Sequence, residues 1–302
     1  MVGEKNNNNG NTARGYVLKP IDDDIFGAFL RYHFLTSPLV CQLFYAYPGS
    51  LTWAQTKLKD LTEAGYLERI YLPRRSRAGS APSLFTLARP GMQRLASLGH
   101  PVPSRARPQR TRTHGFLHLA HAVSVSTLLV NAELLARQHP AITVARMVHD
   151  LDLKRHPVTV ADRDGTHTTV IPDGFLDLHL RGGDGRRYQA SLCLEWDTGS
   201  EHGPRYRQRL RSWLQFAQGP YQQAFATPVL TIAVATPDAT RCAQLVAWTE
   251  AELTALGVED HAHFFLFTAL DLETATPEEI YLAPRWSMPF NRQPVPLVEV
   301  PA

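Results

Sequence analysis

The chain has 302 residues, of which 44% are hydrophobic, and its 31 basic and 28 acidic side chains leave a formal charge of +3. This length suits one large or two modest domains with substantial cores, and the hydrophobic content excludes a disordered chain. No uninterrupted apolar run approaches the ~20 residues of a membrane helix, and the N-terminus lacks the apolar core of a signal peptide. We therefore expect a cytoplasmic protein without membrane contact, whose three scattered cysteines stay reduced.

The small net charge hides an uneven distribution. Residues 1–64 carry six bases and six acids, whereas residues 65–115 carry ten arginines against the single acid Glu68. Residues 116–302 carry 15 bases and 21 acids. A stretch with so many bases and almost no acid indicates a polyanionic partner.

The N-terminal part begins with polar residues 1–15, which include a run of asparagines and are predicted to form a disordered leader. Apolar residues then recur at helical spacing after Asp22, and Thr36 and Ser50 are suited to cap a second and a third helix. The segments YLERIYLP and SLFTLA are predicted strands, joined by the basic loop RRSRAGSAP and followed by a last helix. This order predicts a winged helix-turn-helix domain over residues 16–98.

Such a domain is predicted to bind double-stranded DNA. Polar side chains on its third helix can reach base edges and phosphates, and arginines of the wing and linker can contact the DNA backbone. The alternative is a winged helix used only for protein contact, but arginine on the wing favours DNA. The predicted DNA-binding residues are Gln55, Thr56, Lys57, Lys59, Arg69, Arg74, Arg75, Arg77, Arg105, Arg107, Arg110 and Arg112.

The rest of the chain predicts a second domain. Residues 99–114 are rich in proline and arginine and are a predicted linker that also lies along phosphates. Residues 115–285 contain a long apolar helix, antiparallel strands interrupted by a loop-like stretch, an Arg-rich helix over 204–217, and then a strand, a helix and a strand. A Pro-rich tail, 286–302, closes the chain. The expected fold class is α+β, with a mixed α/β C-terminal domain.

The chemistry is concentrated in Pro172-Asp173-Gly174 and in Glu195-Trp196-Asp197. The turn GGDG between them predicts a hairpin, and strand alternation places Glu195 and Asp197 on one face with Asp173 beside Glu195. Converging carboxylates repel one another unless a cation or a proton lies between them. Because hard oxygen ligands suit Mg²⁺ or Mn²⁺, Asp173 and Glu195 are the predicted metal ligands.

This Pro-Asp…Glu-x-Asp pattern resembles the restriction-endonuclease-like nuclease core of PD-(D/E)xK type. The resemblance implies catalytic roles for Asp173, Glu195 and Asp197, and for Glu133 as an acid on the preceding long helix. The position that holds lysine in that core is Asp197 here. The resemblance therefore implies either that an arginine of the next helix, with Arg209 as our choice, replaces the lysine, or that the domain is an inactive nuclease fold.

The order of parts also resembles the replication-relaxation family of plasmids and other mobile elements. The parts are a winged helix, an Arg-rich linker, a helix with His114, His118 and His121, and the PDG…ExD segment, and they span roughly residues 20 to 280. The resemblance implies DNA binding in replication, relaxation or mobilisation. The histidines have no cysteine or carboxylate partners nearby in the sequence, so no metal is assigned to them.

Three functions stay open at this stage. The first is a DNA-binding protein of a mobile element whose nuclease-like domain cleaves DNA with Mg²⁺ or Mn²⁺. The second is an inactive replication accessory or transcriptional regulator, in which the C-terminal domain mediates dimerisation or docking. In that case Asp173 is only a turn residue, and Glu195 and Asp197 pair with the arginines of the 204–211 helix as a structural network. The third is a protein-interaction adaptor. Apart from double-stranded DNA, the partners considered are a second copy of the chain and a relaxase or replication protein.

Overall fold

The computed structural model describes residues 16–45, 47, 49–71, 83–102, 115–155, 157–161, 165 and 167–301, with only the backbone at Phe116. The chain divides into two compact units, one up to Phe116 and one from Leu117 onward. The predicted leader, and most of the predicted wing loop and linker, lie outside the described residues. Several predicted DNA-binding residues therefore receive no structural description: Arg74, Arg75, Arg77, Arg105, Arg107, Arg110 and Arg112.

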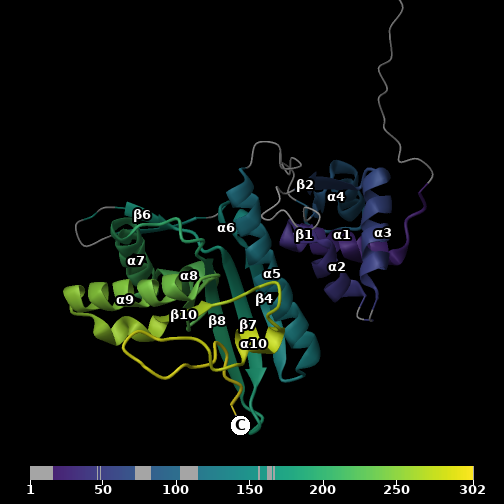
Figure 1. Cartoon of the computed structure of the whole chain (residues 1–302). Coiled ribbons are helices and arrows are strands. Elements are labelled where there is room, and N and C mark those ends of the chain that lie inside the picture. The colour runs from purple at the N-terminus through teal and green to yellow at the C-terminus, as the bar shows by residue number, and fades with distance from the viewer. Residues whose placement is uncertain are drawn as a thin grey trace, which may run out of the picture. The chain divides into compact units, whose positions relative to one another are not determined.

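In the residues that the structure describes, the first unit contains four helices and a small antiparallel sheet (Figure 1). In chain order the elements are α1 (Pro20–Tyr32), β1 (Leu35–Thr36), α2 (Ser37–Phe44), α3 (Leu51–Glu63), β2 (Leu67–Tyr71), β3 (Ser83–Leu87) and α4 (Arg89–Ser97). The strand order is β1-β3-β2. The three helices, two strands and last helix agree with the predicted order, and the two-residue strand β1 is an addition.

Local sequence explains most boundaries of this unit. Helix α1 begins at Pro20, two residues before the predicted start, because proline is well tolerated in a first helical turn. The Asp22 carboxylate accepts a hydrogen bond from the Lys19 backbone N–H at 2.9 Å, which satisfies a free donor of the helix start. Gly65 follows α3 with a φ of 82°, the left-handed conformation in which glycine commonly ends a helix.

The second unit is built on a five-stranded mixed sheet with strand order β10-β9-β8-β7-β4. Strands β4, β7 and β8 are antiparallel neighbours, whereas β9 and β10 run parallel to β8. The strands are β4 (Ile142–His149), β7 (Gly174–Arg181), β8 (Arg187–Trp196), β9 (Thr231–Thr236) and β10 (Phe265–Ala269). A separate hairpin pairs β5 (Val158–Ala161) with β6 (His167–Val170).

Helices cover both faces of this sheet (Figure 1). Leu129 packs over Gly174 of β7 from one face, and the other face carries a core of aromatic and aliphatic side chains that includes Trp213, Phe216 and Leu245. The helices are α5 (Phe116–Gln138), α6 (Asp150–Leu153), α7 (Gly203–Ala217), α8 (Pro220–Phe225), α9 (Ala239–Leu256) and α10 (Pro277–Tyr281). The α+β fold class is confirmed by this arrangement.

Helix α5 contains an apolar segment longer than expected from the sequence. Its segment Leu117–Gln138 is long and apolar enough to cross a membrane by length and composition, although His121, Ser126 and Asn131 interrupt the apolar run. Most of that segment is buried inside the unit, and the Leu128 carbonyl accepts a hydrogen bond from the Tyr281 hydroxyl. Packing in a protein core therefore accounts for its apolar composition.

Candidate functional site

The site begins where β7 and β8 bring Asp173 and Glu195 together. Gly174 pairs with Leu194 in the antiparallel register, so Asp173, directly before β7, lies at the level of Glu195. The Trp196 backbone N–H donates to Asp173 Oδ2 at 2.8 Å, and the Asp173 carbonyl accepts from the Asp150 N–H at 2.9 Å. The structure thus unites the two acids that strand alternation had placed side by side.

Helix α5 contributes a histidine to this pair. His121 Nε2 lies 3.0 Å from Asp173 Oδ2, and both side chains are about one-fifth exposed. Burial alone would lower the pKa of His121, but the hydrogen bond and negative charge of Asp173 raise it overall. Sequence reasoning noticed the helical spacing of the histidines but missed this contact, because nothing in the sequence places α5 against the start of β7.

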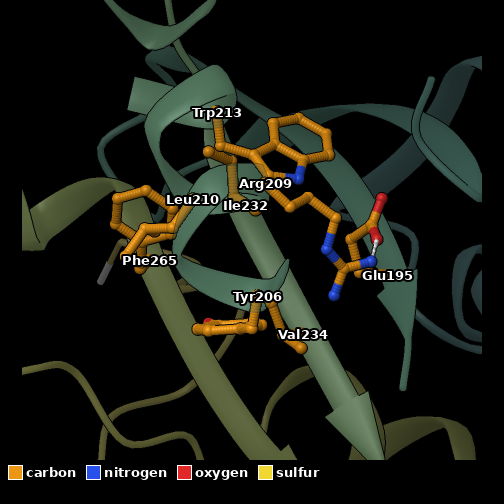
Figure 2. Close-up of a pocket in the computed structure, with 8 residues that line it drawn as sticks. All are labelled: Glu195, Tyr206, Arg209, Leu210, Trp213, Ile232, Val234 and Phe265. Atoms are coloured by element: carbon orange, nitrogen blue, oxygen red, sulfur yellow. Dashed lines mark hydrogen bonds and ion pairs between the residues drawn. The ribbon is translucent and has the colours of Figure 1, made fainter. Parts of the chain in front are cut away.

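Glu195 is the most deeply buried acid of the site, with an exposed fraction of 4%. Its Oε2 accepts a hydrogen bond from Arg209 at 2.9 Å, whereas its buried Oε1 has no hydrogen-bond partner in the described part of the chain. Burial raises the pKa of Glu195 well above its usual range, the charge of Asp173 raises it further, and Arg209 opposes these effects only in part. Figure 2 shows Glu195 and Arg209 paired beside Trp213.

Asp197 has a different environment. Arg241 of α9 binds it through two hydrogen bonds of 2.8 and 3.0 Å, and the Gly199 N–H donates to its Oδ1 at 2.7 Å. The Arg209 guanidinium lies 4.0 Å away. Such a two-pronged arginine contact uses both carboxylate oxygens. Asp197 is therefore held as an ion-pair partner, and Arg241 is a site residue that sequence reasoning did not identify.

Glu133 does not join this cluster. It lies on α5 twelve residues after His121, which corresponds to about 18 Å along a helix axis at 1.5 Å per residue. Its carboxylate forms an ion pair with Arg137 on the next turn. Among the described residues, His121 is thus the α5 side chain that contacts the acids, and Glu133 is placed away from them.

The Arg-rich helix α7 supplies the cation next to the acids. Arg209 contacts Glu195 and also lies 3.1 Å from Glu201, whereas Arg207 turns toward Glu252. Arg205 extends into solvent, 82% exposed, with a 3.7 Å contact to Glu201. The structure therefore places the Arg209 guanidinium beside Glu195 and 4.0 Å from Asp197.

An open cleft gives access to the acid pair. It lies between β6, the Asp173 turn and α7, and it is lined by Thr168, Thr169, Val170, Ile171, Asp173, Glu195, Glu201, Arg205, Gln208, Arg209, Ser212 and Trp213. Asp197 and Glu133 are not among the lining residues. Any ligand that reaches the acids therefore meets Asp173, Glu195 and Arg209 together.

Of the three carboxylates that line this cleft, Asp173 and Glu195 converge, whereas Glu201 lies 3.1 Å from the Arg209 guanidinium. No group of three or more His, Cys, Asp or Glu side chains that could hold a metal ion occurs within the described ranges. Mg²⁺, however, is commonly bound by one or two carboxylates, with water and substrate phosphates completing its shell. The buried, unpartnered Glu195 Oε1 next to the partly exposed Asp173 fits that minimal arrangement.

In the first unit, the predicted DNA-binding residues of α3 separate into two groups. Gln55, Thr56 and Lys59 are exposed, and Arg69 is exposed on β2, where its guanidinium stacks on the Tyr71 ring. Lys57 instead turns inward toward Asp22. Trp53, a large apolar residue of the same helix, is 73% exposed and lies outside the core.

Lys57 belongs to a buried polar cluster. Its ammonium lies 2.8 Å from Asp22 Oδ1 and donates to the Tyr16 hydroxyl at 2.9 Å, while that hydroxyl donates to Asp22 Oδ2 at 3.0 Å. The Asp22 side chain is fully buried and that of Lys57 is 15% exposed. In this arrangement the Lys57 charge is used to neutralise Asp22 rather than presented to solvent.

Glu195→Gln is expected to stabilise the protein at pH 8 in the presence of a chelator. A carboxyl whose pKa is raised in the folded state lowers the free energy of unfolding as pH rises above the pKa of the unfolded chain. The ionised Glu195 therefore destabilises the parent at pH 8 but not below about pH 4. Asp173, Arg209 and Glu201 are the charged groups that face it. The melting temperature should rise by about 2–4 °C for each 1 kcal/mol relieved. A stability gain of Glu195→Gln over the parent that is smaller at pH 8 than at pH 5 would contradict this prediction.

Comparison with known proteins supports one assignment. Neither the curated proteins nor the solved structures contain a match to this chain. The family model described as replication-relaxation matches residues 28–230, about two thirds of the sequence, from α1 to the segment just before β9. The match includes α3, His121, the acid pair and Arg209. The chain therefore belongs to the replication-relaxation family.

Proposed function

We propose that this protein processes the DNA of a mobile element, binding duplex DNA through its first unit and cleaving a DNA strand at Asp173 and Glu195 in its second. Membership of the replication-relaxation family indicates a function related to the replication of mobile elements. The observation that carries the cleavage proposal is the convergence of Asp173, Glu195 and Arg209 on one open cleft. A cation, two acids and room for a substrate are the parts that phosphodiester hydrolysis needs.

The order of elements supports a restriction-endonuclease-like domain. A long helix precedes three antiparallel strands, the Pro-Asp turn and the Glu-x-Asp segment flank the β7–β8 hairpin, and the arginine-bearing helix α7 follows. In the first unit, three helices followed by the β2–β3 hairpin support a winged helix. The exposed α3 residues Gln55, Thr56 and Lys59 would then face DNA.

The acid pair, His121 and Arg209 each have a definable part in this function. Asp173 and Glu195 would hold Mg²⁺ or Mn²⁺, which supplies a Lewis acid that activates water and offsets phosphodiester charge. His121 and the Trp196 N–H hold the Asp173 carboxylate in one orientation. Arg209 places a fixed positive charge beside the acids, where it can neutralise a phosphate oxygen.

An inactive accessory protein is the second candidate, and one observation favours it. The acids already have cationic or proton-donating partners in the protein itself, His121 for Asp173, Arg209 for Glu195 and Arg241 for Asp197. Neutralised in this way, the cluster can persist as a structural network without a metal ion. The second unit would then serve in docking or dimerisation.

Incubation with supercoiled plasmid separates the two candidates. The purified full chain should convert the plasmid to relaxed or linear product in Mg²⁺ or Mn²⁺, and the product should disappear when EDTA replaces the metal. Product that forms equally in EDTA would point to a contaminating activity or another chemistry. The absence of product in both metals, on plasmids that carry the origin of the host element, would favour the inactive accessory.

A further inference from the structure

The cleft extends beyond the acid pair along one face of α7. Arg205, Gln208 and Ser212 follow one another at intervals of three and four residues, so they form a stripe on one side of the helix together with Arg209. The opposite wall is the β5–β6 hairpin, which contributes Thr168 and Thr169. Apart from Arg209, the residues of this polar track do not hold the acids and have no part in the function proposed above.

The side chains of the track are mainly hydrogen-bond donors. Arg205 and Gln208 are exposed, and in the described part of the chain the one ion pair of Arg205 is the 3.7 Å contact to Glu201. Thr168 and Ser212 join the two walls through a 2.9 Å hydrogen bond between their hydroxyls. A guanidinium, an amide and hydroxyl groups are the groups that contact nucleic-acid phosphates and sugars. Val170 and Ile171 add apolar surface beneath them.

The size and walls of the cleft favour one strand over two. The cavity has a volume of about 350 Å³, within the roughly 300–1,000 Å³ typical of sites for small ligands. The Thr168–Ser212 hydrogen bond joins the hairpin to α7, and we expect a separated strand, which is thinner than a duplex, to enter a cleft of this volume. Arg205 and Arg209 place two positive charges beside the carboxylates of the cleft, and proteins that track a single strand contact its backbone through such cations.

We propose that this cleft binds a single DNA strand, with Arg205, Gln208 and the Thr169 hydroxyl contacting the backbone next to the phosphodiester at Asp173 and Glu195. The inference rests on the proposed function for the location of that phosphodiester. It adds the substrate class: the strand reaches the acids unpaired. Arg205, 82% exposed, rather than Arg209, one-third exposed, is the residue that positions the neighbouring phosphate.

Site-specific photo-crosslinking tests the proposal in the full chain. A benzophenone amino acid replaces Gln208, or Gln218 as the matched control, since Gln218 is an exposed glutamine at the end of the same helix and outside the cleft. The probes are a labelled single-stranded oligonucleotide, the duplex of the same sequence, and a mononucleotide, all in EDTA so that no cleavage occurs. Crosslinks at position 208 with the single strand, and not with the other two probes, are expected.

A second variant tests the assigned phosphate contact. Arg205→Ala should reduce the crosslink at position 208 by about tenfold, the effect of losing a hydrogen bond to a charged group. Arg186→Ala is the control, because Arg186 is equally exposed but lies in the turn at the far end of the β7–β8 hairpin. Equal crosslinking at positions 208 and 218, preference for duplex or mononucleotide, or no effect of Arg205→Ala would overturn the proposal.

The same experiment distinguishes this inference from the cleavage proposal. Strand-specific crosslinks at position 208, combined with no plasmid product in any metal, would leave the strand site intact and reject catalysis. Metal-dependent plasmid cleavage without a crosslink at position 208 would retain catalysis and reject the strand site.

Discussion

Asp173→Asn should abolish metal-dependent plasmid cleavage while leaving the fold and duplex binding unchanged. Asparagine keeps an oxygen that can accept the Trp196 N–H, and it keeps the size of the side chain, so the β7–β8 hairpin is expected to persist. It removes the negative charge that a divalent cation requires. Loss of an outer partner of a metal ligand already costs about 10–100-fold, and we therefore expect the loss of a ligand to exceed 100-fold in rate.

Asp177→Asn is the matched control for that experiment. Asp177 lies on β7, accepts hydrogen bonds from Gln189 and Ser191 at 2.9 Å, and does not line the cleft. Its variant should cleave at the parental rate. If Asp173→Asn cleaves as fast as the parent, the acid pair has no catalytic role. If both variants lose activity equally, the effect is one of general stability.

The acid pair was predictable because its geometry is local. A turn such as GGDG fixes the hairpin, the register of a hairpin then fixes which residues are neighbours, and the period of two fixes their face. Helix α9, the helix predicted between the last two strands, has similarly local signals: Asp238 caps its start, and Gly257, with a φ of 67°, follows its end. Signals that act within a few residues were sufficient for both.

The partners of the acids were not predictable because their geometry is tertiary. His121 reaches Asp173 across 52 positions of sequence, and Arg241 reaches Asp197 across 44. Which turn of α5 or α9 meets the end of the sheet depends on how the apolar faces pack, and no spacing rule contains that information. The same limit explains why Glu133, the acid first associated with α5, lies away from the cluster.

The β5–β6 hairpin, a second part of the site, was not predicted because of the polar composition of its segment. The segment between β4 and β7 is rich in turn-forming and charged residues, so it was predicted to be loop-like. The structure forms α6 and the β5–β6 hairpin there, because α7 and α8 provide a surface on which β5 and β6 can pack. Tertiary packing commonly overrides weak strand propensity. The hairpin is the wall that turns the acid pair into a cleft.

Lys57→Met should destabilise the first unit by about 3 kcal/mol, the lower end of the cost of breaking a buried ion pair. The methionine leaves the fully buried Asp22 carboxylate without its cation. Although burial lowers it, the hydrogen bonds to Asp22 and Tyr16 raise the pKa of Lys57 overall. A raised lysine pKa contributes stability that is complete below the unfolded value of about 10.4, so an experiment at pH 7.5 measures the whole effect.

Lys59→Met, two residues further along α3, is the matched control. Lys59 is two-thirds exposed, and its 3.8 Å contact to Glu63 joins two solvated groups, so its loss should cost no more than about 0.5 kcal/mol. Hydrogen exchange of the α3 amides, followed peptide by peptide, reports on this unit alone. We expect faster exchange in Lys57→Met and parental exchange in Lys59→Met. Equal protection in both variants would show that the buried pair contributes nothing.

Duplex DNA binding should depend on Lys59 rather than on Lys57, which is the reverse of the order expected for stability. Lys59→Met is expected to reduce the slope of log affinity against log salt by about one, the effect of losing one phosphate contact. The double variant Asp22→Asn/Lys57→Met removes both buried charges, so it should recover most of the lost stability. If Lys57 serves only the interior, that double variant binds duplex DNA with parental affinity and salt dependence. A folded double variant with a reduced salt slope would instead return Lys57 to the DNA-binding surface, where its sequence position had first placed it.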